Sequence, residues 1–136
     1  EMSRIPLFGI IYKRGSVLIN RKDEQSRKES YQKMKDVLNM GMHMCIYPEG
    51  TRNKTDEPLK SFHDGAFRLS HETGKKIIPA IIRGTKEMLP THKTFYFWPG
   101  NISMQFLAPI DPKNFNDLYE LKEQVYQVML KEIKHH

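Results

Sequence analysis

The apolar positions of residues 23–40 and 114–134 recur at the spacing of a helix that buries one face. In the first segment Ser26 and Glu29 match a capping-box spacing, and Gly41 supplies a stop. The side chains expected to point inward are Tyr31, Met34, Val37 and Leu38 in the first segment and Phe115, Leu118, Leu121, Val125, Val128 and Met129 in the second. The pattern predicts two amphipathic helices, and the second should cover a sheet.

Shorter apolar runs are typical of strands. They are residues 17–19, 42–47, 76–83, 94–98 and 102–107. Pro79 interrupts the third run, which favours an edge or a bulge, and the residues at 99–101 (PGN) have hairpin turn chemistry that should pair the last two runs. Met40, Met42 and Met44 alternate as the core-facing side chains of a strand do. Residues 42–47 are therefore predicted to be a buried strand.

The order of these elements predicts an α/β fold with a mixed, partly parallel sheet flanked by helices. A short helix over 65–73, with Phe67 and Leu69 inward and Gly74 as its terminator, separates two of the strands. The polar stretch 49–61 has no periodicity and is predicted to be a loop. Since ligands bind at the carboxyl ends of strands in such sheets, this loop is the expected position of a site.

Composition favours a single packed domain over residues 1–136, since 38% of the residues are hydrophobic and 28% are charged. The one cysteine, Cys45, excludes an internal disulfide, and we expect it to be a small core residue. No apolar run approaches the roughly 20 residues that span a bilayer. The spacing of His, Cys and acidic residues matches no zinc site, so neither a metal nor another cofactor is expected.

The formal net charge of +6 favours an anionic partner, which charge alone leaves open among a nucleic acid, an anionic membrane surface and a phosphorylated substrate. The aromatic run 95–98 (FYFW) could stack on bases, so a small basic nucleic-acid-binding module is one alternative. Its charges are dispersed rather than gathered in one run, which counts against this alternative.

The segment 48–53 (PEGTRN) has the chemistry of a phosphate site. A proline ends the preceding run, Gly50 frees the backbone, and the Thr51 hydroxyl and Arg52 guanidinium could hold a phosphate together with backbone N–H groups. Glu49 could orient Arg52. The alternative is a solvated turn in which Glu49 and Arg52 merely pair on the surface.

The string YPEGTRN at residues 47–53 resembles the third conserved block of the glycerolipid acyltransferase family. Residues 15–21 (GSVLINR) are similar to its second block, residues 78–84 (IPAIIRG) to its fourth, and residues 60–67 (KSFHDGAF) to the stretch after block three. The resemblance covers nearly the whole chain. It implies a glycerol-3-phosphate acyltransferase-like fold and transfer of an acyl group from acyl-CoA or acyl carrier protein to 1-acyl-glycerol 3-phosphate, giving phosphatidic acid.

The resemblance also implies roles for particular residues. Arg21, together with Glu49, Gly50, Thr51 and Arg52, would hold the glycerol phosphate. Gly15 corresponds to the glycine of the second block, and Pro79 would shape the acyl-donor side. The basic surface would face anionic lipid at the cytoplasmic side of a membrane, as a peripheral protein or through an anchoring segment beyond this sequence.

The family's first block, His-x4-Asp, supplies the general base and the carboxylate that orients it. The positions five places after His43, His63, His71 and His92 hold Pro48, Arg68, Lys76 and Phe97, and His135 and His136 end the chain. The pair is therefore expected upstream of Glu1, with the chain truncated at its N-terminus and inactive alone.

Two alternatives bear on the missing pair. His63 beside Asp64 could substitute as a base, but adjacent residues point in different directions and a surface turn is the favoured interpretation. A noncatalytic scaffold of the same fold is the other alternative, and it differs only in whether a His-x4-Asp pair precedes these residues.

Overall fold

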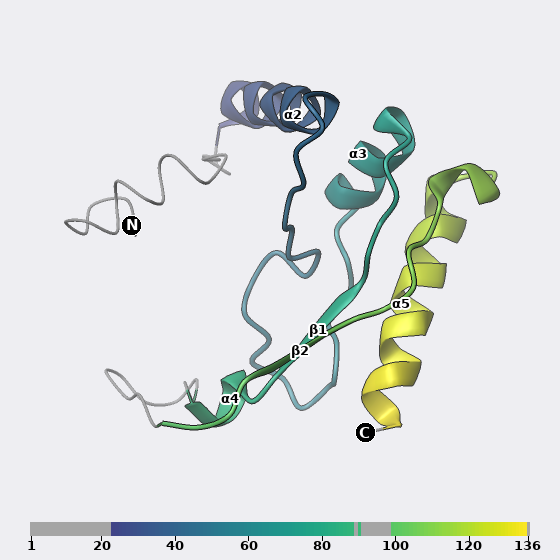
Figure 1. Ribbon diagram of the computed structural model, residues 1–136. Helices are drawn as coiled ribbons and strands as arrows, with labels where there is room; N and C mark the ends of the chain where they lie inside the picture. Colours follow the sequence, from purple (N-terminus) through teal and green to yellow (C-terminus); the bar gives the residue numbers. More distant parts are fainter. Residues whose placement is uncertain (1–22, 89, 91–98, 136) are drawn as a thin grey trace. The chain divides into compact units, whose positions relative to one another are not determined.

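A computed structural model of the protein describes residues 23–88, 90 and 99–135 (Figure 1). The chain divides into two compact units, Glu1–Cys45 and Ile46–His136, which are described separately. The predicted strands 17–19 and 94–98, the hairpin that would use the latter, and the aromatic run 95–98 lie outside the described residues.

In the first unit, helix α2 spans Glu24–Asn39 and confirms the predicted helix. It begins because the Asp23 carboxylate accepts a hydrogen bond from the Gln25 N–H at 3.0 Å while the Asp23 backbone is extended. The predicted capping box is wrong, since Ser26 and Glu29 lie inside the helix, where the backbone has already turned. The four apolar side chains predicted to face inward are half-buried.

Residues 42–47 are not a strand, which corrects the sequence-based prediction. Met40 is 66% exposed, Met42 is 50% exposed and Cys45 is exposed, while Met44 is half-buried, so most of the expected core positions are exposed. A strand needs a neighbour to accept and donate its backbone hydrogen bonds, and none of the described residues pairs with this segment. The alternation of methionines matches a strand, but among the described residues no neighbouring strand pairs with this segment.

In the second unit, strands β1 (Ala80–Arg83) and β2 (Ser103–Phe106) form an antiparallel pair, with Ala80 opposite Phe106 and Arg83 opposite Ser103. Before β1, Pro79 lacks a donor but its carbonyl accepts from the Leu107 N–H at 2.9 Å. This confirms a β segment interrupted at Pro79. The antiparallel part of the mixed sheet is thus present, while the parallel part stays a prediction.

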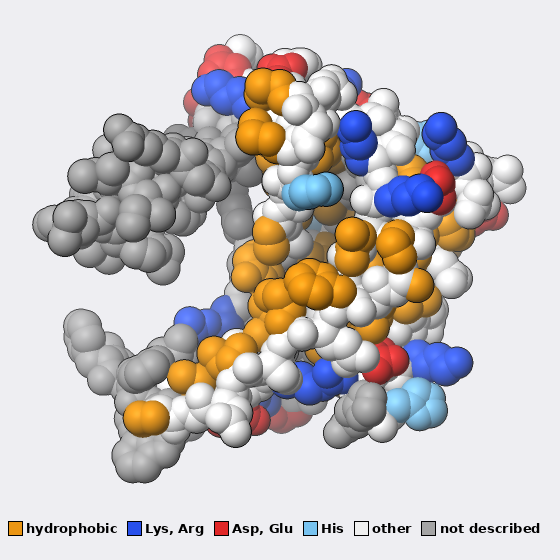
Figure 2. Space-filling view, in the orientation of Figure 1, with side chains coloured by type: hydrophobic (Ala, Val, Ile, Leu, Met, Phe, Trp, Pro, Cys, Tyr) orange, Lys and Arg blue, Asp and Glu red, His pale blue; other side chains and the backbone are white. Residues whose placement is uncertain are grey.

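One face of this β-ribbon lies against the C-terminal helix α5 (Leu118–Lys134). Gln105 joins the two elements, accepting from the Arg83 guanidinium at 2.8 Å and donating to the Glu132 carboxylate at 2.8 Å. The other face is apolar and exposed within the described part, and Figure 2 shows hydrophobic side chains gathered along it. The exposed residues there include Ile102, Met104 and Phe106, which are 51–67% accessible.

The remaining helices are α3 (Gly65–Thr73), the single turn α4 (Thr85–Met88) and a 3-10 turn at Pro112–Asn114. Helix α3 confirms its prediction, ending at Gly74 with φ +65°. Helix α5 starts later than the predicted residue 114, because the Asp117 carboxylate accepts from the Glu120 N–H at 2.8 Å and caps it there.

The core of the second unit lies between α3, α5 and the end of the 49–61 loop (Figure 1). Its buried side chains are Leu59, Phe62, Phe67, Leu121 and Val125. The Phe62 ring stacks on Phe67 at 5.9 Å between centroids and meets Tyr126 edge-on at 5.1 Å. Because Leu59 and Phe62 are in the core, Lys60 and His63, which follow them, are held at fixed positions on its surface. No described helix is long and apolar enough to cross a membrane.

Candidate functional site

A tight turn at Tyr47–Gly50 opens the candidate site. The Gly50 N–H donates to the Tyr47 carbonyl at 3.0 Å, and Gly50 has φ +68°, a conformation that favours glycine. This amide is therefore used inside the turn, so the backbone donor expected for a phosphate at Gly50 is already engaged. Glycine serves the geometry of the turn here.

The turn is joined to the end of the loop by three contacts. The Glu49 carboxylate accepts from the Lys60 backbone N–H at 3.1 Å, and the Lys60 ammonium donates to the Thr51 hydroxyl at 2.8 Å. The His63 backbone N–H donates to the Pro48 carbonyl at 2.9 Å. Since residues 59–62 are anchored in the core, these contacts hold the turn against the folded body of the unit.

Glu49 and Arg52 do not form the surface pair considered as the alternative. Glu49 bonds to the Lys60 main chain, while the exposed Arg52 guanidinium has no hydrogen bond or ion pair within the described part of the chain. Lys60 is the functional candidate that the assignment of site residues missed. In the sequence, Lys60 was marked only as the lysine of the 60–67 stretch that resembles the family. Its contact with Thr51 spans a loop without periodicity, so no local sequence pattern predicts it.

Between its two anchored ends the loop closes on itself. The Asn53 side chain donates to the Glu57 carbonyl at 2.8 Å and accepts from the Thr55 N–H at 2.9 Å. Arg52 therefore lies between two turns, the anchored one at Tyr47–Gly50 and the exposed one that starts at Asn53. The Lys60 ammonium bonds to the Thr51 hydroxyl, and Arg52 is the next residue in the chain. An ammonium, a hydroxyl and a guanidinium together suit an anion with several acceptor oxygens.

The predicted site residues are only partly brought together. Glu49, Gly50, Thr51 and Arg52 form the turn described above, while Pro79 is buried at the entrance to β1. Arg21 and Gly15 lie outside the described residues. Among the described residues no group of His, Cys, Asp and Glu side chains has the arrangement of a metal site.

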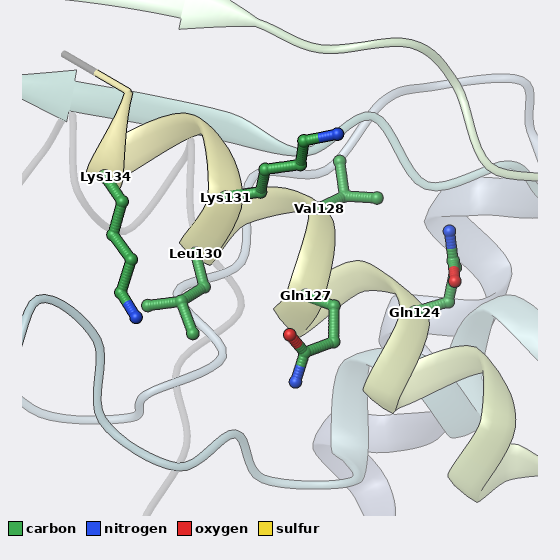
Figure 3. A pocket seen from close by; sticks show the side chains of 6 residues that line it. All are labelled: Gln124, Gln127, Val128, Leu130, Lys131 and Lys134. Atoms are coloured by element: carbon green, nitrogen blue, oxygen red, sulfur yellow. The ribbon is translucent and has the colours of Figure 1, made fainter.

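A hollow elsewhere in the second unit contains none of these residues (Figure 3). All of its lining side chains come from α5: Gln124, Gln127, Val128, Leu130, Lys131 and Lys134. Its wall is a single helix surface, so it does not bring separate elements together as the Tyr47–His63 contacts do.

The fold agrees with comparisons to known proteins. The family model described as Acyltransferase matches residues 1–83, which is 83 of 136 residues. The chain belongs to the acyltransferase family.

Individual relatives are named for a particular acyltransferase activity. A 1-acyl-sn-glycerol-3-phosphate acyltransferase of Chlamydomonas reinhardtii is 30% identical over 122 residues, covering 88% of this chain and 36% of that protein. The chloroplastic 1-acyl-sn-glycerol-3-phosphate acyltransferase of Arabidopsis thaliana is 32% identical over 107 residues, covering 78% of this chain and 30% of that protein.

Among solved structures, the 1-acyl-sn-glycerophosphate acyltransferase PlsC from Thermotoga maritima superposes with a TM-score of 0.81 at 26% identity, covering 98% of this chain and 53% of that one. The chain thus spans about a third of the length of these two curated relatives, at 36% and 30%, and about half of the solved one, at 53%.

Proposed function

We propose that the turn at residues 47–52 binds the phosphate of a glycerol-phosphate acceptor in an acyl transfer that forms phosphatidic acid from 1-acyl-glycerol 3-phosphate. The observation that carries this proposal is the Arg52 guanidinium, exposed beside a turn that the Glu49–Lys60–Thr51 contacts hold in place. Relatives named for this activity support the choice of acceptor.

The charges around the turn suit a phosphate dianion. Arg52 presents parallel N–H donors that can bond two phosphate oxygens at once, and Lys60 has two further donors besides the one that Thr51 accepts. The neighbouring acid, Glu49, already accepts from the Lys60 main chain and is half-buried. A bound phosphate would supply acceptors to the Arg52 guanidinium and to the remaining Lys60 donors.

The rest of the proposal follows the family. Arg21 would add a further cation to the acceptor phosphate, and Pro79 would shape the side of the acyl donor, which is acyl-CoA or an acyl carrier protein. No metal or other cofactor takes part. The basic surface would work at the cytoplasmic face of a membrane that carries anionic lipid. In this proposal the net charge of +6 attracts anionic lipid and the phosphorylated substrate, and not a nucleic acid.

The acceptor-binding role is tested by calorimetric titration with glycerol 3-phosphate and with a lysophosphatidic acid. Arg52→Ala should weaken binding by about tenfold or more, since a charge-assisted bidentate contact is typically worth roughly 1.5–3 kcal/mol. Arg52→Lys should recover only part of the loss, because an ammonium cannot bond two oxygens in the same fork.

Lys54→Ala is the matched control, since Lys54 is an exposed cation two residues away with no ion pair among the described residues. It should change the affinity by less than about twofold, as expected for a screened surface charge. Equal losses in Arg52→Ala and Lys54→Ala would show that only general charge attracts the phosphate.

A further inference from the structure

The His63 imidazole occupies the space that a side chain at position 50 would need. A Cβ on Gly50 would lie 2.7 Å from His63 Cδ2, closer than real Cβ contacts occur, and 3.0 Å from Nε2, which is a tight contact. The ring edge that carries Nε2 is therefore the part of His63 against the Gly50 backbone. The absence of a side chain at Gly50 and the position of the imidazole depend on each other.

The backbone at His63 is held on both sides. Its N–H donates to the Pro48 carbonyl at 2.9 Å, and the preceding Phe62 is buried in the core. The following residue, Asp64, accepts from the Lys122 ammonium of α5 at 2.7 Å. The ring thus extends toward the turn from an anchored segment and not from a free loop.

Side-chain nitrogens of Lys60 and His63 consequently lie against two adjacent residues of the turn, Thr51 and Gly50. Lys60 Nζ lies 2.8 Å from the Thr51 hydroxyl, and His63 Nε2 lies against Gly50, the residue before it. Gly50 and Thr51 are adjacent, with Cα atoms about 3.8 Å apart, so both nitrogens lie beside the same two-residue segment of the turn. The imidazole has no hydrogen bond within the described part of the chain, and its side chain is exposed.

The two acids nearest the ring in the sequence of the turn and its anchored segment, Glu49 and Asp64, have other partners. Glu49 accepts from the Lys60 main chain, and Asp64 is paired with Lys122. A histidine acting as a general base needs a carboxylate to orient it, and the adjacent Asp64 carboxylate bonds to Lys122 instead. A histidine that donates to a phosphate needs only an N–H directed at it.

We propose that His63 is a further phosphate-binding residue of the acceptor site, seated against Gly50 and donating from Nε2 to the phosphate held by Arg52 and Lys60. This inference rests on the proposed function and adds one residue to the same site. It also gives Gly50 a second reason to be glycine, which is to leave room for the ring.

The test compares the affinity for glycerol 3-phosphate, measured by calorimetry, in wild type and four variants. His63→Ala should lose about tenfold, as for a hydrogen bond to a charged group. His63→Lys, which places an N–H donor at the same position, should retain more than half of the affinity. Gly50→Ala should lose at least as much as His63→Ala, since its methyl displaces the ring and φ +68° disfavours alanine.

His71→Ala is the control, because His71 is an exposed histidine near the C-terminal end of α3 whose side chain has no hydrogen bond or ion pair among the described residues. It should bind as wild type does. As a second measurement on wild type, inorganic phosphate should shift the imidazole NMR signals of His63 and leave those of His71 in place.

The outcomes separate the two proposals. Loss of affinity in Arg52→Ala with none in His63→Ala would overturn the role of His63 and leave the phosphate site intact. A loss in His63→Ala that His63→Lys does not reverse, without a phosphate-induced shift of the His63 signals, would assign His63 to packing and overturn the inference. A wild-type chain that binds neither glycerol 3-phosphate nor inorganic phosphate would overturn both proposals.

Discussion

The Lys122 ammonium donates to the Asp64 carboxylate at 2.7 Å, and this hydrogen bond, with the charge of Lys122, holds the pKa of Asp64 below its usual 3.8. A carboxyl whose pKa is lowered by folding stabilises the protein above its unfolded pKa and loses that contribution as the pH falls through the folded value. The contact ties the residue after His63 to α5, so it bears on the site as well as on stability.

Asp64→Asn should therefore be less stable than wild type at pH 7, with a difference that persists to about pH 5 and disappears as the pH falls below about 4. Urea denaturation midpoints from pH 7 to pH 3 measure this. Asp56→Asn is the control, because Asp56 is exposed and has no ion pair among the described residues. A difference between Asp64→Asn and wild type that did not change with pH would contradict an ionic contribution.

At the scale of the elements, the N-terminus of α5 is set by one side chain. The Asp117 carboxylate accepts from the Glu120 N–H at 2.8 Å, and the Glu120 carboxylate accepts in return from the Asn116 N–H at 3.2 Å. The helix carries Leu121 and Val125 into the core, so its first turn is coupled to the packing beneath the 49–61 loop.

Asp117→Ala should lower the free energy of unfolding by about 1 kcal/mol, the typical cost of removing an N-cap side chain. Asn116→Ala removes a neighbouring exposed side chain and leaves the backbone donor to Glu120, so it should change stability by less than about 0.5 kcal/mol. Chemical denaturation of both variants makes the comparison. Equal stabilities would place the start of α5 under the control of core packing alone.

At the scale of the whole molecule, binding and proton transfer are separable. The 136 residues contain no His-x4-Asp pair. The turn that we assign to the acceptor phosphate is within the described residues, whereas Arg21 and Gly15 are outside them. The Asp64 carboxylate, which is adjacent to His63 in the sequence, is bonded to Lys122.

The chain should accordingly bind lysophosphatidic acid but form no phosphatidic acid from it with acyl-CoA or acyl carrier protein. A general base and its orienting acid typically contribute factors of about 10²–10⁴ or more to such reactions. Binding and product formation are to be measured on the same preparation. Any product formation by the chain would contradict the separation, and its loss in His63→Ala at saturating lysophosphatidic acid would make His63 a base.

Local signals in the sequence were sufficient for several elements. Helix α3 was predictable because Phe67 and Leu69 face inward and Gly74 ends it, and the interruption at Pro79 follows from its missing N–H. The turn at Gly50 and the family were predictable from one string of consecutive residues. In each case the cause lies within a few positions of the residue concerned.

Contacts between distant positions were decided by the tertiary structure. The strand prediction at 42–47 was wrong because alternation does not supply a hydrogen-bonding neighbour. The sequence did not place Lys60 or His63 against the turn, although His63 was considered as a base, because both contacts span a stretch without periodicity. Their positions are set by Leu59 and Phe62, which are drawn into the core beside α3 and α5. The sequence of the turn thus specifies its chemistry, and burial of two residues in the loop determines which side chains surround it.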